Sequence, residues 1–241
     1  METIDDWQPE VVIVGGGDFP THDRPLSLLR RAGRVVCCDG AAVAYTDWWN
    51  SERMTLCPSP AEDEAAGYAR PSNLWQIVGD GDSLPEPHRQ HYADIFTHFA
   101  GQDDNDQTKA TRYVAERNLR RIAYVAATGR REDHTLGNIS LLMDYARQGL
   151  DVRMYTDHGV FIPATAATPA TETSRTFATP VGTQVSVFAF GTKGLHADGL
   201  QYPLSDFTTW WQGTLNQAIA PQVTIAAQGD FLVYISYERK G

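Results

Sequence analysis

The stretch Ile77-Val78-Gly79-Asp80-Gly81-Asp82-Ser83 ends a short apolar run and places two carboxylates one residue apart. The apolar residues at 74–78 are typical of a buried strand. Gly79 and Gly81 permit a sharp turn directly after that strand. Residues two positions apart in an extended turn point the same way, so Asp80 and Asp82 can share one target. Convergent carboxylates repel one another unless a cation lies between them, and the stretch therefore predicts a Mg²⁺ site.

Composition limits the class of protein. The 241 residues are 42% hydrophobic and 21% charged, which suits one large domain or two small ones. The net charge of -10 argues against a nucleic-acid backbone as partner. No apolar run reaches the roughly 18 residues of a membrane span, so no membrane association is expected. The acidic N-terminus does not read as a signal peptide, and the three cysteines fit a reduced compartment, so we expect a cytoplasmic location.

The first part of the chain alternates strands with helices. Strands are predicted at residues 11–14, 35–38, 74–78, 95–99, 122–126 and 152–155, and helices at 24–32, 41–49, 61–69, 106–117 and 135–148. This alternation predicts a mostly parallel sheet with helices on both faces. We therefore expect an α/β domain over residues 1–150.

The pattern changes in the last third of the chain. Residues 164–180 are rich in Thr, Ala and Pro and predict a loop or a domain junction. Short alternating runs follow at 184–190, 223–226 and 231–237, separated by Gly, Asp and Pro. These runs predict a small all-β domain over residues 151–241.

Charged side chains follow four consecutive strands of the predicted sheet. Ligands bind at the carboxyl ends of the strands in open parallel sheets. The charged residues at these ends are Asp39 after the second strand, Asp80 and Asp82 after the third, Asp103, Asp104 and Asp106 after the fourth, and Arg130, Arg131 and Asp133 after the fifth. Four charged loops at one edge of a sheet predict a shared site.

The residue types in this site suit phosphoryl-type transfer. Carboxylates hold Mg²⁺, the metal bridges phosphate oxygens, and Lys or Arg neutralises charge as the bond breaks. Lys109 lies three residues after Asp106, so both lie on one side of a helix. Arg131 offers a bidentate fork for a phosphate. We expect Asp80, Asp82 and Asp106 to hold the metal.

Purely structural interpretations remain open for the same residues. The carboxylates of Asp80 and Asp82 can accept hydrogen bonds from their own turn. Lys109 can be a solvated helix residue, and Arg131 can pair with Glu132 or Asp133 at a helix start. Tyr202 can be an ordinary half-buried tyrosine of a strand.

Five short motifs occur in order along nearly the whole chain. They are DGAA at residues 39–42, GDGDS at 79–83, DDNDQTKA at 103–110, GRREDH at 129–134 with Asn138, and GLQYPL at 199–204 with Asn216. In this order and approximate spacing the sequence resembles the thiamine pyrophosphokinase family. It departs from the family where Asn105 replaces Thr, Arg130 replaces the second Gly and Leu215 replaces Ser.

The resemblance implies both fold and activity. It implies an N-terminal α/β domain, a C-terminal β-sandwich and a homodimer with the site between subunits. It implies ATP-dependent transfer of a diphosphoryl group to the hydroxyl of thiamine, giving thiamine diphosphate and AMP. It also implies a catalytic set made of Asp80, Asp82, Asp106, Lys109, Arg131 and Asp133, and a substrate-binding and nucleotide-binding set made of Asp39, Gly79, Ser83, Asn105, Thr108, His134, Tyr202 and Asn216.

Two other functions fit the charged residues. One is a pyrophosphokinase that acts on another hydroxymethyl heterocycle, such as a pterin. The other is a sensor that binds a Mg-nucleotide and does not turn it over. The spread of metal-type and charge-neutralising residues over four loops argues against the sensor.

Overall fold

The computed structural model describes residues 6–56, 69–99, 101, 104–168 and 170–239. Contacts between residues divide the chain into two compact units. The first, called here the α/β unit, comprises Glu10–Thr135. The second, called the β unit, comprises Met1–Pro9 and Leu136–Gly241. None of the described helices is long and apolar enough to cross a membrane.

The α/β unit is built on a parallel sheet with the strand order β5-β1-β2-β3-β4. The strands are β1 (Val11–Val14), β2 (Val35–Cys38), β3 (Leu74–Gly79), β4 (Phe96–His98) and β5 (Arg121–Val125). Every residue of β1 and β2 is buried. Their sequences are continuous apolar runs because helices cover both faces of the sheet.

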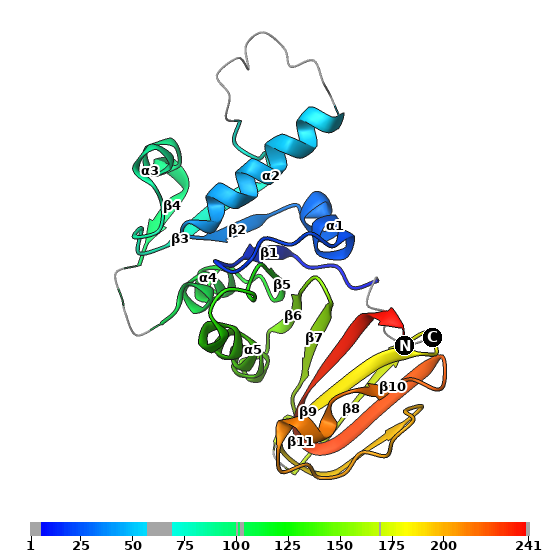
Figure 1. Ribbon diagram of the computed structural model, residues 1–241. Helices are drawn as coiled ribbons and strands as arrows, with labels where there is room; N and C mark the ends of the chain where they lie inside the picture. Colours follow the sequence, from blue (N-terminus) through cyan, green and yellow to red (C-terminus); the bar gives the residue numbers. More distant parts are fainter. Residues whose placement is uncertain (1–5, 57–68, 100, 102–103, 169, 240–241) are drawn as a thin grey trace. The chain divides into compact units, whose positions relative to one another are not determined.

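Helices flank this sheet. They are α1 (Asp23–Arg31), α2 (Ala41–Leu56), α3 (Glu86–His91), the 3-10 turn η2 (Ala93–Ile95) and α4 (Asp106–Ala115). Figure 1 shows α2 and α4 on opposite sides of the strands. The chain builds the sheet outward from β1 to β4 and then returns to place β5 on the other side of β1. Right-handed crossovers in opposite directions put their helices on opposite faces.

The β unit consists mainly of antiparallel strands. They are β6 (Asp151–Tyr155), β7 (Gly159–Ala164), β8 (Glu172–Ala178), β9 (Thr183–Asp198), β10 (Asn216–Gln217) and β11 (Gln222–Arg239). The 3-10 turn η3 (Trp210–Gly213) precedes β10, and helix α5 (Glu132–Arg147) begins in the α/β unit and continues into this one.

Strands β9 and β11 run through both halves of the β unit. The first half of β11 pairs with β8 and the second half pairs with β7, while β9 pairs with both halves. The β9–β11 register shifts between Ala226 and Asp230, where Gly229 has a φ of 92°. A bulge of this kind bends a strand and increases its twist. The bend allows one pair of long strands to serve both halves.

The predicted fold class is confirmed, with an α/β part and a C-terminal β part. The prediction of a loop over residues 164–180 is wrong, because β8 occupies Glu172–Ala178. This segment has few apolar residues, and its strand is set by pairing with β11. The helix predicted at 61–69 lies almost entirely outside the described residues, and the domain boundary at 150 stays a prediction.

The β8 strand gives the first testable prediction. Phe177 is 1% exposed, so Phe177→Ala should lower the free energy of unfolding by about 3–5 kcal/mol through lost burial and a residual cavity. Urea unfolding followed by circular dichroism measures this loss. Val181→Ala is the control, because Val181 is 57% exposed. Equal midpoints for the two variants would contradict the placement of β8 in the core.

Candidate active site

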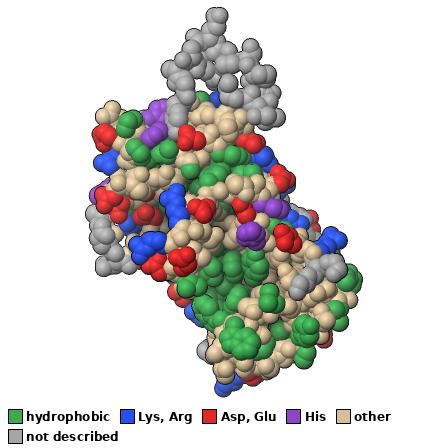
Figure 2. Space-filling model, viewed as in Figure 1, with side chains coloured by type: hydrophobic (Ala, Val, Ile, Leu, Met, Phe, Trp, Pro, Cys, Tyr) green, Lys and Arg blue, Asp and Glu red, His purple; other side chains and the backbone are tan. Residues whose placement is uncertain are grey.

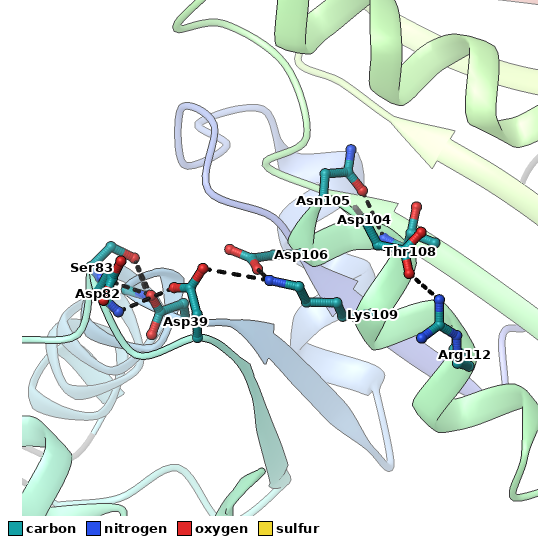
Figure 3. Close-up of polar contacts among 11 residues, drawn as sticks. Asp39, Asp82, Ser83, Asp104, Asn105, Asp106, Thr108, Lys109 and Arg112 are labelled. Atoms are coloured by element: carbon teal, nitrogen blue, oxygen red, sulfur yellow. Dashed lines mark hydrogen bonds and ion pairs between the residues drawn. The ribbon is translucent and has the colours of Figure 1, made fainter. Parts of the chain in front are cut away.

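The charged residues gather where the strands of the α/β unit end. Asp39 follows β2, Asp80 follows β3, and Asp106 opens α4. Figure 3 shows Asp106 and Lys109 between the group formed by Asp39, Asp82 and Ser83 and the group formed by Asp104, Asn105 and Arg112. The predicted convergence at one edge of the sheet is therefore present for these residues.

Asp39 is fixed by Ser83. The backbone N and the Oγ of Ser83 donate hydrogen bonds of 2.8 and 2.7 Å to Asp39 Oδ2. Ser83 Oγ in turn accepts a hydrogen bond of 3.0 Å from the backbone N of Gly40. Asp39 is 1% exposed, and its Oδ1 is buried with no hydrogen-bond partner among the described residues. A buried carboxylate oxygen without a donor is suited to a cation.

Lys109 joins two of the carboxylates. Its Nζ lies 3.1 Å from Asp106 Oδ1 and 3.5 Å from Asp80 Oδ2. The lysine side chain is 4% exposed, whereas those of Asp80 and Asp106 are 24% and 34% exposed. The interpretation of Lys109 as a solvated helix residue is therefore wrong. Its three N–H donors lie at the center of the charged cluster.

The cluster changes the proton affinity of its members. Burial, with the charges of Asp80 and Asp39, raises the pKa of Asp106 above its ordinary value, although Lys109 opposes this. A backbone hydrogen bond from Asp82 and the charge of Lys109 lower the pKa of Asp80. Burial would lower the pKa of Lys109, but the hydrogen bond and charge of Asp106, with Asp80, raise it overall. Lys109 therefore stays protonated and supplies a permanent positive charge.

Two glycines give the turn after β3 its shape. A Cβ on Gly79 would lie 2.7 Å from Asp39 Cβ, so only glycine lets β3 end this close to Asp39. Gly81 has a φ of 84°, in the left-handed region that favours glycine. The backbone N of Asp82 donates a 3.2 Å hydrogen bond to Asp80 Oδ1, as the Asp-Gly turn interpretation predicts. The Asp82 side chain is exposed.

The start of α4 is capped locally. Asn105 is the N-cap, and its Oδ1 accepts a 2.9 Å hydrogen bond from the backbone N of Thr108. Arg112, one turn further along, forms an ion pair with Asp104. The side chain of Asn105 thus fixes the helix end that carries Asp106 and Lys109. Asp103 lies outside the described residues.

Arg131, Asp133 and His134 form a separate exposed group. Arg131 donates hydrogen bonds of 3.1 and 2.6 Å to the two carboxylate oxygens of Asp133, and Asp133 accepts a further 2.9 Å bond from the backbone N of His134. The hydrogen bond to Asp133 raises the pKa of Arg131, and the same bond lowers that of Asp133. Hydrogen bonds and ion pairs of the described residues do not connect this group to Lys109.

Tyr202 and Asn216 lie in the β unit. Asn216 is 5% exposed, and its Oδ1 accepts hydrogen bonds from the backbone N of Tyr202 at 3.0 Å and of Gln217 at 2.9 Å. Its Nδ2 donates a 2.8 Å bond to the carbonyl of Tyr202. Tyr202 is 58% exposed, so its side chain is accessible from solvent. Asn216 therefore fixes the backbone that presents the Tyr202 ring.

Asp18, in the loop after β1, contacts the GRREDH motif and is not predicted from the sequence. A Cβ on Gly129 would lie 2.4 Å from Asp18 Oδ2, and Gly129 has a φ of 107°. Arg130 Nε lies 3.9 Å from Asp18 Oδ1. A charged residue after the first strand was the only available signal, because Asp18 belongs to none of the motifs.

The residues present fit a magnesium ion in part. Within the described part of the chain, no group of three or more His, Cys, Asp or Glu side chains is arranged to hold a metal ion. Mg²⁺ in nucleotide sites is usually bound by one or two carboxylates together with substrate phosphates and waters. Asp80, Asp106 and the unpartnered oxygen of Asp39 offer such donors, so the donor set fits a metal that arrives with a nucleotide.

Comparisons with known proteins identify similar sequences and folds. The family model described as "Thiamin pyrophosphokinase, catalytic domain" matches residues 26–154, more than half of the chain. The model described as "Thiamin pyrophosphokinase, substrate-binding domain" matches residues 159–234. Comparison with curated protein sequences gives no match.

Several solved structures share the fold. Thiamine pyrophosphokinase from Bacillus subtilis has a TM-score of 0.68 and 19% identity, covering 94% of this chain and 97% of that one. The yeast thiamin pyrophosphokinase has a TM-score of 0.71 and 13% identity, covering 98% and 90%. The Geobacillus thermodenitrificans protein has a TM-score of 0.64 and 23% identity, covering 95% and 97%.

The link between Asp39 and Ser83 gives a second prediction. Ser83→Ala removes the Oγ donor to a buried carboxylate, so it should lower the free energy of unfolding by about 1–3 kcal/mol. Thermal unfolding of the purified variant measures the change. Ser27→Ala is the matched control, because the hydrogen bond of Ser27 Oγ to Asp23, among the described residues, is exposed and 3.4 Å long. A loss no larger than that of the control would show that the Ser83 hydroxyl does not stabilise the buried Asp39 carboxylate.

Proposed function

The chain belongs to the thiamin pyrophosphokinase family and forms thiamine diphosphate from thiamine, and from this premise we propose how its residues carry out the reaction. ATP with Mg²⁺ binds at the edge of the sheet where β2 and β3 end and α4 begins. The observation that carries this assignment is the Lys109 ammonium, buried between Asp80 and Asp106. No observation on the described residues favours a pterin substrate or a sensor without turnover.

The metal belongs with the carboxylates of this edge. Asp80, Asp82 and Asp106 would hold Mg²⁺, and Asp39 lies close enough to add its charge to that of Asp106. A bound Mg²⁺ ion draws charge from phosphate oxygens. The exposed Asp82 side chain supports the assignment, because its carboxylate accepts no hydrogen bond from the described residues.

Lys109 stabilises the group that moves. The thiamine hydroxyl oxygen forms a bond to the β-phosphorus, and the bond from that phosphorus to the oxygen shared with the α-phosphate breaks. AMP leaves with the shared oxygen, and the hydroxyl proton passes to solvent. Lys109 Nζ can exchange a carboxylate partner for a phosphate oxygen and neutralise charge on the diphosphoryl group. We assign no general base, since such transfers depend mainly on positioning and charge.

Arg131 is a second positive group for the phosphates. Its guanidinium is paired in a fork with Asp133, which holds the planar group in one orientation. Both side chains are well exposed, so a phosphate can reach Arg131. Gly79, Ser83, Asn105, Thr108 and His134 complete the proposed nucleotide site, chiefly by fixing backbone at the strand and helix ends.

Tyr202 is the proposed contact for thiamine. A flat cationic thiazolium ring is attracted to an aromatic face. Tyr202 presents an exposed ring, and Asn216 holds its backbone through both amide atoms. Asn216 therefore supports thiamine binding through Tyr202, and direct contact of Asn216 with thiamine stays a prediction.

A homodimer with the thiamine site at the subunit interface completes the proposal, together with a cytoplasmic location. The β unit exposes several large hydrophobic side chains, and Figure 2 shows hydrophobic residues gathered on one of its faces. The exposed ones are Leu136, Val181, Tyr202, Trp210, Trp211, Leu215 and Ile219. Contact with a second copy would remove such side chains from water.

The reaction and the metal assignment are tested together. AMP should be released from ATP only when thiamine is present. Asp82→Asn keeps the shape of the side chain and removes its charge, so kcat should fall by on the order of a hundredfold, the scale for loss of one preorganised electrostatic partner. The fold should survive because Asp82 is exposed. Near-normal turnover of this variant at saturating Mg²⁺ would rule out Asp82 as a metal ligand.

Tyr202 gives a test of the organic substrate. Tyr202→Ala should raise the KM for thiamine by about tenfold and leave the KM for ATP unchanged, because only the stacking face is lost. Tyr202→Phe is the matched control, since it keeps the ring and should bind thiamine nearly normally. Steady-state kinetics with each substrate varied in turn measures both constants. An unchanged thiamine KM in Tyr202→Ala would place thiamine elsewhere.

A further inference from the structure

Arg89 contacts the turn that carries Asp80 and Asp82, although it belongs to none of the motifs. It lies in α3, and its Nη2 donates hydrogen bonds to the carbonyl oxygens of Gly81 and Leu84, the latter at 3.3 Å. These two carbonyls flank Asp82 and Ser83. One guanidinium group therefore bridges the two ends of the segment that presents Asp82.

The same turn is packed closely at Gly81. A Cβ on Gly81 would lie 3.3 Å from Cζ of the Phe96 ring and 3.8 Å from Cζ of Arg89. The aromatic ring of Phe96 in β4 and the guanidinium of Arg89 in α3 therefore both lie beside Gly81. Gly81 has a φ of 84°, and a glycine can leave this conformation easily because it populates many others. These two neighbours restrict it.

The turn is consequently held from two directions. On one, Ser83 is bound through its N and Oγ to the buried Asp39 carboxylate. On the other, Arg89 is bound to the Gly81 and Leu84 carbonyls, and Leu84 itself is 1% exposed. Asp80 and Asp82 lie within this restrained segment. Their separation and direction depend on both sets of contacts.

Arg89 acts through backbone atoms and not through charge pairing with the two aspartates. Among the described residues its ion pair is with Glu86 Oε2, 3.7 Å from its Nε in the same helix. Its side chain is 47% exposed, so that ion pair is weak. Hydrogen bonds to two carbonyls from one planar group are directional, and they fix geometry more than they add charge.

We propose that Arg89 is a positioning residue for the Mg²⁺–nucleotide site, which orients Asp80 and Asp82 by binding the backbone on either side of Asp82. The inference rests on the proposed function of that turn. Residues that orient metal ligands typically change metal affinity by about 10-fold to 100-fold when they are removed. Arg89 makes no contribution to thiamine binding in this arrangement.

The test measures metal binding without turnover. Mn²⁺ is titrated into the full-length protein with α,β-methylene ATP, whose bridging carbon replaces the oxygen at the bond that breaks, and bound Mn²⁺ is followed by electron paramagnetic resonance. Arg89→Ala should weaken Mn²⁺ binding by about tenfold or more. Arg89→Lys keeps donors without the planar group and should give a smaller loss. Steady-state assays should show an unchanged KM for thiamine in both variants.

Arg70→Ala is the control, because Arg70 loses an ion pair of 2.8 Å with Asp94 in the same unit but does not contact the turn. The Mn²⁺ affinity of Arg70→Ala should equal that of the wild type. All variants should unfold thermally within a few degrees of the wild type. If Asp80→Asn loses affinity and Arg89→Ala does not, the metal site stands and the positioning role of Arg89 is wrong. If neither variant loses affinity, Mn²⁺ binds elsewhere, and both the metal site and this inference are overturned.

Discussion

A single buried ammonium group keeps the carboxylates together at one edge of the α/β unit. Lys109 is 4% exposed in its side chain and hydrogen bonds with Asp106 and Asp80. Carboxylates this close would otherwise repel, and burial would favour the neutral form of Asp106. The charge of Lys109 therefore allows an acidic site to persist before any cation or phosphate arrives. The same charge then suits a reaction in which negative charge moves between phosphates.

The parallel sheet brings these groups together from distant parts of the chain. Asp39 and Asp80 follow neighbouring strands, and Asp106 begins the helix that packs on β3 and β2. The ends of β2 and β3 can approach this closely only with glycine at position 79, since a Cβ on Gly79 would lie 2.7 Å from Asp39 Cβ. The geometry of the site therefore depends on the order of the strands and on the glycine at position 79.

The β unit positions the exposed Tyr202 ring in another way. The side-chain amide of Asn216 accepts a hydrogen bond from the backbone N of Tyr202 and donates one to its carbonyl. A neighbouring strand would make the same two bonds. Leu215, directly before it, has a φ of 62°, which is uncommon for a leucine. Strain of this kind persists when surrounding contacts impose it, and it is frequent at functional sites. Leu215 is also 69% exposed, so its large side chain is not what imposes the strain through packing in the core.

Much of the α/β unit could be predicted from the sequence because its signals are local. Buried parallel strands are continuous apolar runs, helices have their own period, and polar residues after strands lie at one edge of the sheet. These rules located the strands β1 to β5 and the convergence of Asp39, Asp80 and Asp106. The glycine positions also predicted the turn at Gly81.

The sequence by itself determined the strands β1 to β5, the helices α1, α2 and α4 and the charged edge, but not the short helix α3. The tertiary structure alone decided the hydrogen-bond partners. Pairing with β11 made a strand of Glu172–Ala178, although that segment has few apolar residues. Likewise, Ser83 hydrogen bonds to Asp39, and Asn216 hydrogen bonds to the backbone of Tyr202 and Gln217. The hydrophobic periodicity of a segment indicates which of its side chains are buried. A hydrogen bond between residues far apart depends on distances that exist only after the chain has packed.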